Sequence, residues 1–392
     1  MSGFHYLVAA CTLVLWLSTV CPATVHDVLC RNGSSAFAAT FRTGVQASVG
    51  PQRNGELSTR TCQASISWAD QRLFVANDAA QIDLDAFGVD MDGLGPVAAF
   101  QIKRPYAQCC MAYQIYSLDI PPRLLRTING GQWFRAADTD LDGRVEIWTD
   151  EAAVLDGFEG FRLADIQFVP LIVLRFEQGQ LLDVSSEFKK DFDQTIIKLR
   201  TTINPDRIRE FRASDGKLQQ SSPLAFKDRI RFQQLRATKL KLLQIVWAYI
   251  YSGREQEAWR VLADMWPPQD IKRISRAIVH MRAHGIISQL DGISNGSAPE
   301  KHMAKIYRQS QVTPAQPIMV RCYPRCGQRL GNLELRVNLV IDSAGKVRSV
   351  EPIGVTADET ITRAAEEWKF IPASKNGRSV TSRLKGAVSL RQ

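Results

Sequence analysis

The sequence predicts a multidomain α+β protein. A long N-terminal part alternates short apolar runs with polar turns, the middle of the chain has a helical period, and the last sixty residues return to a strand pattern. The chain of 392 residues is long enough for two to four domains, and its 45% hydrophobic and 23% charged content is that of an ordinary globular protein. We therefore expect an N-terminal all-β domain, a helical middle and a small C-terminal ββαβ domain.

The first residues predict a signal peptide, residues 1–23. An apolar run from Leu7 to Val20 precedes Cys21-Pro-Ala23, and polar residues follow from Thr24. The run is short for a membrane-spanning helix, which needs about 18–20 apolar residues. We expect an exported protein, periplasmic or secreted. Because no Lys or Arg precedes the run, an uncleaved inner-membrane anchor is the alternative, and membrane contact is expected only in that case.

The cysteines agree with export. Removal of the leader leaves an even number, which favours disulfides in an exported chain. Cys30–Cys62 and Cys322–Cys326 are the pairs that the order along the chain suggests, although other pairings are open. A metal site at Cys322 and Cys326 has no nearby His or Cys to complete it. The six cysteines are Cys30, Cys62, Cys109, Cys110, Cys322 and Cys326.

Residues 24–184 predict one all-β domain, either a sandwich or propeller-blade-like. Pro170 interrupts the last apolar run, so we expect that strand to be at an edge or bulged. Two aspartate-rich turns lie about fifty residues apart, which is the length of one four-stranded propeller blade. The apolar runs that predict strands are 64–68, 72–76, 97–103, 112–117 and 166–176.

The second of these turns, Asp138-x-Asp140-x-Asp142-Gly143-x-x-Glu146, is the strongest chemical motif. A hard cation such as Ca²⁺ binds several oxygen ligands at short range, and alternate aspartates in a tight loop can all face one centre. Gly143 permits the sharp turn, and the carbonyl of residue 144 would add a backbone oxygen. The bidentate acid that an EF-hand needs is missing, because Thr149 takes that position. The alternative is an Asx-turn hairpin whose carboxylates are only solvated.

From Gly130-Gly131-Gln-Trp-Phe134 through Ile147-Trp148, this segment resembles an FG-GAP/VCBS repeat. The resemblance implies calcium bound between blade strands, as a structural cofactor. The implied ligands are Asp138, Asp140, Asp142, the carbonyl of Arg144, and Glu146. The first aspartate-rich turn, residues 83–93, is a weaker match because its acids are spread out, and within it Asp90 and Asp92 are the candidates.

Residues 185–292 predict a helical region. Phe188, Phe192, Ile196 and Leu199 follow a helical period, and Asn204-Pro205 ends that helix and begins another. A longer helical stretch covers 224–290. Its segment 242–267 resembles a tetratricopeptide hairpin, but such arrays usually need about three or more units. We therefore favour one helical hairpin packed on the β domain, followed by a linker at 293–317 that begins in a Gly-, Ser- and Asn-rich stretch.

Residues 318–392 predict the ββαβ domain. Alternate apolar residues from Leu333 to Ile341 indicate a half-buried strand, and Asp342-x-x-Gly345 indicates the turn of a hairpin. A short helix ending near Trp368 and a last strand after Asn376-Gly377 complete the order.

These residues, with the run Trp368-Lys-Phe-Ile-Pro372-Ala, resemble the C-terminal domain of TonB-type proteins. The resemblance implies a periplasmic module that adds its sheet edge to a partner, namely an envelope or outer-membrane protein. The chain departs from an energy transducer in two ways, since it lacks a long Pro-rich spacer and its apolar N-terminus looks cleavable.

Charge is unevenly placed along the chain. Residues 24–184 contain 13 Lys and Arg against 20 Asp and Glu, whereas residues 321–392 contain 13 against 7. This division argues against a nucleic-acid protein with one large basic face. It fits a cation-binding front and a back half that meets anionic envelope material, or simply a solvated surface.

No catalytic constellation is recognisable. His280 and His284 share a helix face, but Met281 stands where a zincin needs glutamate, so a surface pair is expected. No nucleophile elbow, P-loop or dinucleotide fingerprint occurs. We expect an exported cell-envelope binding protein rather than an enzyme. The alternatives are an anchored TonB-type energy transducer for outer-membrane transport, and a metal-dependent hydrolase with the aspartate turns as its metal centre.

Overall fold

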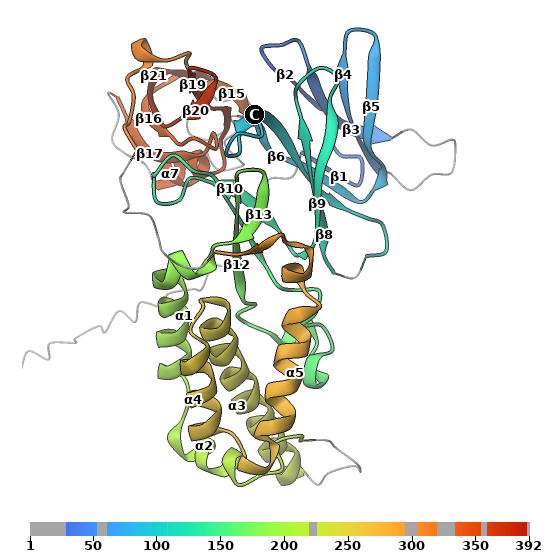
Figure 1. Cartoon of the computed structure of the whole chain (residues 1–392), viewed down its shortest axis with the longest axis vertical. Coiled ribbons are helices and arrows are strands. Elements are labelled where there is room, and N and C mark those ends of the chain that lie inside the picture. The colour runs from blue at the N-terminus through green and yellow to red at the C-terminus, as the bar shows by residue number, and fades with distance from the viewer. Residues whose placement is uncertain are drawn as a thin grey trace, which may run out of the picture.

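A computed structural model describes residues 29–52, 61–107, 109–218, 226–294, 304–319, 334–353 and 359–389. Antiparallel sheets and helices alternate along the chain, so the predicted mixed α+β class is confirmed. The helices of residues 189–283 gather at one end of the molecule, and two β-rich parts, one of which includes a further short helix, lie side by side at the other (Figure 1).

Two antiparallel sheets stack face to face at the start of the described chain. Apolar side chains from both sheets, such as Ile66 and Phe100, fill the space between them. The first sheet has the order β2-β3-β4-β5, with β2 (Phe37–Thr40), β3 (Gln46–Gln52), β4 (Thr61–Trp68) and β5 (Gln71–Ala79). The second has the order β1-β6-β7-β8-β9, with β1 (Cys30–Arg31), β6 (Gln81–Asp90), β7 (Pro96–Lys103), β8 (Met111–Ser117) and β9 (Arg123–Gly131).

A third sheet connects this β part with the helices. Its inward side chains, including Phe134 and Ile147, belong to one continuous core with the second sheet and the helical bundle. Tyr113 of β8 stacks on Phe134 with ring centroids 4.8 Å apart. The order is β10-β11-β12-β13-β14, with β10 (Phe134–Ala137), β11 (Glu146–Asp150), β12 (Leu171–Glu177), β13 (Gln180–Asp183) and β14 (Gly292–Ile293).

The prediction for Pro170 was wrong. The strand begins at Leu171, after the proline, and β12 lies between β11 and β13 rather than at an edge. Proline lacks an N–H to donate, so it stands before the ladder and offers only its carbonyl, which accepts from Glu151 N at 3.0 Å. The residues before it form a loop with a short 3₁₀ turn at Leu163–Asp165.

The prediction of an aspartate-rich turn at residues 83–93 was also wrong for most of its length. Residues up to Asp90 belong to strand β6, and only the end of the segment forms the turn. Asp83 and Asp85 are buried in this strand, each 5% exposed. The apolar residues Ile82 and Leu84 between them belong to the core of the stacked sheets. The segment therefore alternates as a strand does, with acids in place of the usual polar residues.

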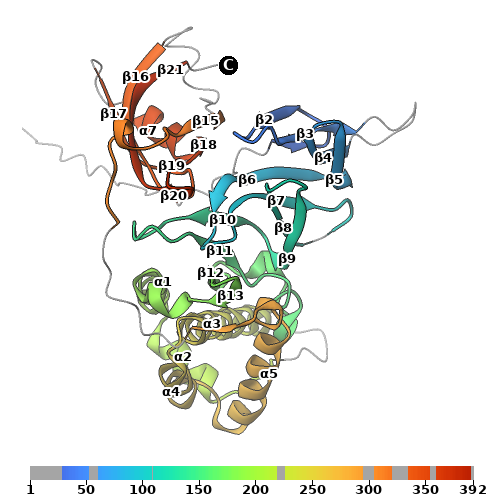
Figure 2. The same cartoon turned by 45° about the horizontal axis from the view of Figure 1, so that its top comes forward.

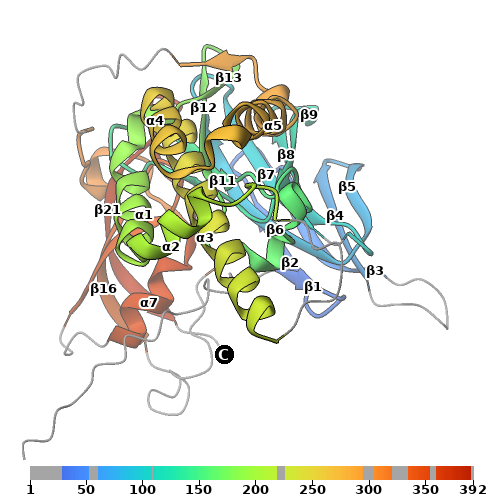
Figure 3. The same ribbon diagram turned by 90° about the horizontal axis from the view of Figure 1, so that it is seen from below.

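The helical middle agrees with its predicted period. Phe188, Phe192, Ile196 and Leu199 are all buried, and Asn204 caps the second helix by accepting a hydrogen bond from Asp206 N. The long helix α3 packs against α4 and against β12, and the helices lie side by side in the view from below (Figure 3). They are α1 (Lys189–Thr201), α2 (Pro205–Arg212), α3 (Phe226–Tyr251), α4 (Glu255–Met265) and α5 (Ile271–Ala283).

The C-terminal domain contains a three-stranded sheet with the order β17-β16-β21, and two small pairs, β15 with β18 and β19 with β20. The alternating apolar residues of β16 point into a core shared with Trp368 and Ala365. The elements are β15 (Gln316–Met319), β16 (Glu334–Ile341), β17 (Val347–Pro352), α7 (Glu359–Glu366), β18 (Lys369–Ile371), β19 (Ala373–Lys375), β20 (Arg378–Val380) and β21 (Ser382–Ser389). Strand, strand, helix and final strand follow in the predicted order.

The predicted linker at 293–317 differs from the structure at both described ends. Ile293 belongs to β14, which pairs in parallel with β13. Further on, Tyr307 N donates to Thr381 O, and Thr313 N donates to Ser374 O at 2.9 Å. Backbone hydrogen bonds thus attach residues 304–319 to the C-terminal domain, so this part is no free linker.

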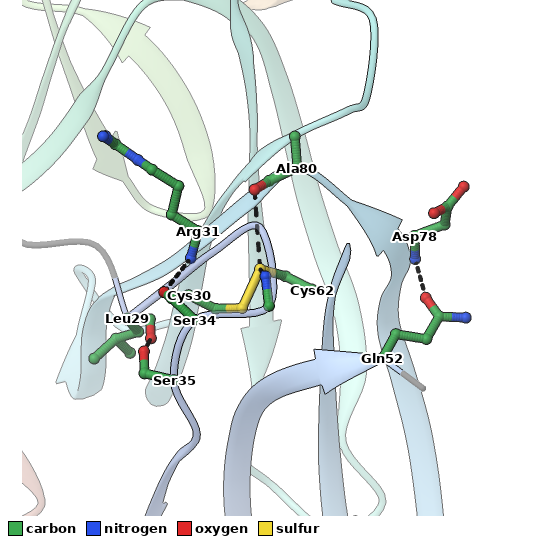
Figure 4. The surroundings of a disulfide bond; sticks show 10 residues. Leu29, Cys30, Arg31, Ser34, Ser35, Gln52, Cys62, Asp78 and Ala80 are labelled. Atoms are coloured by element: carbon green, nitrogen blue, oxygen red, sulfur yellow. Dashed lines mark hydrogen bonds between the residues drawn. A yellow bond between two sulfur atoms is a disulfide. The ribbon is translucent and has the colours of Figure 1, made fainter. Parts of the chain in front are cut away.

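One of the two suggested disulfides is present. Cys30 and Cys62 are bonded, with Cα atoms 6.0 Å apart, and both are fully buried beside β6 (Figure 4). A second bond joins the adjacent Cys109 and Cys110. Cys322 and Cys326 lie outside the described residues.

The predicted leader also lies outside the described residues. Within the described ranges, no helix combines the length and the apolar character that a membrane crossing would require.

Candidate metal centre

The aspartate loop (residues 138–145) joins β10 to β11. The two strands pair with Ala137 opposite Glu146, so Asp138 and Glu146 both lie at the mouth of the hairpin, where the ladder ends. Leu141 and Gly143 both have positive φ, +59° and +90°. Glycine adopts this conformation without strain, and the tight turn that results folds the aspartates back toward the strand ends.

Three of the predicted ligands come together. Carboxylate oxygens of Asp138, Asp140 and Glu146 all lie within 4.8 Å of one another. Asp138 and Glu146 are fully buried, and Asp140 is half-buried. Carboxylate oxygens at this spacing are the donor set that a hard cation prefers.

The other two predicted ligands pair with each other. Asp142 accepts hydrogen bonds from Arg144 N at 2.8 Å and from Arg144 Nε at 2.7 Å, and it forms an ion pair with Nη2. Asp142 is therefore not a member of the three-carboxylate group among the described residues.

Each buried acid of the group uses one oxygen locally. Asp138 Oδ2 accepts from Gly143 N at 3.1 Å, and Glu146 Oε2 accepts from Thr139 N at 2.9 Å. The other oxygens, Asp138 Oδ1 and Glu146 Oε1, accept no hydrogen bond. Burial raises the pKa of Glu146 to about 9 and also raises the pKa of Asp138. Buried polar atoms are normally paired, so these two oxygens are the atoms of the group that could take a proton or a cation.

Arg175 brings a cationic side chain close to this group, with Nη1 3.8 Å from Glu146 Oε1. The guanidinium is 1% exposed and is already held by two other glutamates. Glu187 binds it through both oxygens, at 3.0 and 2.8 Å, and Glu177 Oε1 accepts from Nε at 3.0 Å. The carboxylates of Glu177 and Glu187 therefore offset the charge of Arg175, so this arginine does not neutralise the carboxylates of the aspartate loop.

The aspartate loop also contacts the C-terminal domain. Asp138 Oδ2 accepts hydrogen bonds from Ser343 Oγ at 3.0 Å and from Thr381 Oγ1 at 3.3 Å, and Asp138 N donates to Asp342 Oδ2 at 3.2 Å. Arg348 Nη2 donates to Thr139 O, and Ala304 N donates to Leu141 O. The sequence did not predict these contacts, because the two sides lie far apart in the chain. The Asp342-x-x-Gly345 turn was recognised, but only as the turn of a hairpin.

Two lysines of the C-terminal domain form a second contact that the sequence did not predict. Lys346 Nζ lies 2.7 Å from Asp85 Oδ1 and donates to Asp85 O, while Lys369 Nζ lies 2.7 Å from Asp83 Oδ2. Asp85 Oδ2 also accepts from the Tyr113 hydroxyl and from the backbone N–H of residue 136, both at 2.7 Å. Burial alone would raise the pKa of Asp85, but the two lysines lower it below its usual value. With so many donors around its carboxylate, we assign Asp85 as ionised.

The remaining candidate residues, two aspartates and two histidines, form hydrogen bonds within the chain or lie on the surface. Asp90 Oδ1 accepts from Gly93 N within its own turn, and Asp92 Oδ2 accepts from Gln178 N. His280 and His284 are exposed neighbours on α5, and His284 Nδ1 lies 2.7 Å from the His280 carbonyl. The predicted surface pair is confirmed.

No protein-family model, no curated protein and no solved structure matches this chain. The resemblances to TonB-type and FG-GAP/VCBS domains therefore stay predictions.

Proposed function

We propose that this chain is an exported cell-envelope binding protein, with a structural Ca²⁺ site at the aspartate loop and a C-terminal domain that acts as the binding module. The observation that supports the site is the pair of buried oxygens, Asp138 Oδ1 and Glu146 Oε1, that accept no hydrogen bond. Both belong to a group of three carboxylates within 4.8 Å.

A divalent cation would compensate these oxygens better than a proton. Asp138, Asp140 and Glu146 would hold it, with the Arg144 carbonyl as the expected backbone ligand. Ca²⁺ tolerates irregular sets of oxygens, whereas Mg²⁺ demands a nearly octahedral arrangement. Asp142 would join only after releasing Arg144. The chemistry supplied is charge neutralisation inside a buried loop, which is a structural role.

The position of the site supports a link to the C-terminal domain. Asp138 uses its second oxygen to hold Ser343 and Thr381. A cation on the aspartate loop would fix Asp138 and thereby fix this contact. The domain is also held by two lysine–aspartate pairs, in which Lys346 is buried and Lys369 is half-buried. A domain docked in this way favours a binding protein over an energy transducer, which has to reach across the periplasm.

Thermal unfolding tests the calcium site. We expect saturating Ca²⁺ to raise Tm by about 5 °C or more above the value in EGTA. The Asp140→Asn variant should lose this response. Asp92→Asn is the matched control, because Asp92 belongs to the other aspartate-rich segment and should leave the response intact. A wild-type Tm that does not change with chelator would rule out the site.

The mass of the mature protein tests export. A chain that begins near Thr24 is expected, and it would exclude the anchored transducer. The buried Cys30–Cys62 disulfide supports an oxidising compartment. For the hydrolase alternative, Asp140→Ala is informative. We expect it to lower thermal stability without removing any hydrolytic activity of the wild type.

A further inference from the structure

The C-terminal sheet has a hollow on the face that is turned away from α7. A groove of about 390 Å³ lies there, within the size range of ligand sites. The opposite face carries Val337, Leu339 and Ile341, which pack in the core with Ala365. Strands β16, β17 and β21 form the floor of the groove, and Arg308 and Gln309 form one wall. Figure 2 shows this sheet at the outside of the molecule, away from the helical bundle.

The strand register decides which side chains share the groove. Asn338 of β16 lies between Glu351 of β17 and Lys385 of β21. Two residues further along β16, Val340 lies between Ser349 of β17 and Arg383 of β21. Since alternate residues of a strand share a face, these two rows point into the groove together.

The charge of the groove is divided between its two sides. Arg383 and Lys385 are exposed on β21, and the exposed Arg308 stands on the wall. Among the described residues that line the groove, Glu351 on β17 is the one acidic side chain. The floor between them is formed by the uncharged Asn338, Val340 and Ser349. The side along β21 is therefore basic, and the floor can form hydrogen bonds.

We propose that this groove binds an extended acidic peptide segment of a partner, along the β21 side. Arg383 and Lys385 are two residues apart on one face of a strand, which places them about 7 Å apart. An extended peptide presents alternate side chains with the same spacing, so carboxylates at positions i and i+2 would meet the two cations. The amides of Asn338 and Gln309 can bind the peptide backbone. This inference rests on the proposed role of the C-terminal domain as the binding module.

A peptide fits the groove better than a membrane surface does. The cations stand at the side of a hollow rather than on a convex face, so the ligand has to enter between the wall and the strands. A flat bilayer would meet the rim without filling the groove. An anionic membrane is therefore an outcome of the test and not part of the proposal.

Fluorescence anisotropy with the full-length protein tests the proposal. The probe is a short labelled peptide in which glutamate and threonine alternate, and the control peptide has glutamine in place of glutamate. We expect the glutamate peptide alone to bind, and its binding to weaken as salt rises. The double variant Arg383→Gln with Lys385→Gln should weaken binding about tenfold or more. Glu351→Gln should strengthen it, because it removes a repulsive carboxylate.

A matched control removes the same charge elsewhere. Lys189 and Lys190 are both exposed at the start of α1, and their replacement by glutamine should leave the affinity unchanged. Equal weakening by both double variants would overturn the groove, as would failure of the wild type to bind the peptide. Binding to phosphatidylglycerol vesicles but not to the peptide would overturn the partner class.

The measurement is made with Ca²⁺ and with EGTA, and Tm is recorded in the same samples. A chelator-sensitive Tm without peptide binding would reject only the groove. Peptide binding with a chelator-insensitive Tm would reject only the calcium site.

Discussion

Buried acids with a raised pKa are the residues at which we expect the stability of this protein to depend on pH. Glu151 is fully buried and accepts hydrogen bonds from Ile286 N at 3.0 Å and from the Tyr251 hydroxyl at 3.2 Å. Burial raises its pKa from 4.5 to about 7, and the nearby Asp150 and Asp183 add to the rise. It lies outside the aspartate loop, so its titration can be tested separately from the calcium site.

The raised pKa predicts a pH-dependent stability. Between pH 4.5 and 7 the folded protein holds a proton on Glu151 that the unfolded chain has released. This contribution is therefore complete below pH 4.5 and is lost as pH rises toward 7. Urea denaturation should show that Glu151→Gln removes a dependence of up to about 3 kcal/mol.

The comparison has to be between wild type and variant, because Asp150 also has a pKa raised by burial, to about 6. If the free energy of unfolding changes equally with pH in both proteins, Glu151 does not carry the raised pKa.

Among the elements, the β10–β11 hairpin contains a positive-φ glycine that lies at a contact with another part of the chain. Gly143 has φ +90°, and a Cβ there would lie 3.3 Å from Ala304 Cβ of the segment attached to the C-terminal domain. Gly93 has a similar φ of +84° in the other aspartate-rich segment, but a Cβ there would contact nothing within 4 Å. Substitution of Gly93 therefore tests backbone strain alone, whereas substitution of Gly143 tests strain together with the contact to Ala304.

We expect Gly143→Ala to lower Tm more than Gly93→Ala does. Both variants pay a positive-φ strain of about 1–2 kcal/mol, but only the first also displaces the contact with the C-terminal domain. Gly143→Ala should also reduce the Tm response to Ca²⁺. Calorimetry in Ca²⁺ and in EGTA measures both effects, and equal losses in the two variants would contradict this account of the hairpin.

At the scale of the whole molecule, acidic residues of the N-terminal part form ion pairs with basic residues of the C-terminal domain. The acidic N-terminal part supplies Asp83 and Asp85, and the basic C-terminal domain supplies Lys369 and Lys346. Apolar contacts join the same interface, since Met319 and Ile371 belong to the core of the two stacked sheets. The two parts therefore share a core as well as charges.

The Lys346–Asp85 pair predicts a clear mutational result. Lys346→Met leaves the Asp85 carboxylate buried without this cation and should cost about 3–5 kcal/mol of folding free energy. Lys346→Met with Asp85→Asn should cost less than Lys346→Met alone, because the stranded charge is removed. Chemical denaturation of Lys346→Met, Asp85→Asn and the double variant measures the coupling between the two residues. Additive losses of folding free energy would show that the pair is not coupled.

The sequence by itself determined the local elements. The alternation from Leu333 to Ile341 predicts β16, and the period through Phe192 and Ile196 predicts α1. The spacing of the aspartate loop predicts carboxylates around one point, and the structure brings together Asp138, Asp140 and Glu146 but not Asp142. Each of these depends on residues close together in the chain, where the hydrophobic period and turn chemistry act directly.

Only the tertiary structure decided which partner each polar residue meets. Asp83 and Asp85 resemble turn residues in the sequence, yet they are buried in β6 because Lys369 and Lys346 reach them from the other end of the chain. Likewise, the hydrogen bonds to Asp138 come from Ser343 and Thr381, whereas Asp142 pairs locally with Arg144. A buried charge is stable only beside its partner, and such partners lie hundreds of residues away, beyond the reach of any local pattern.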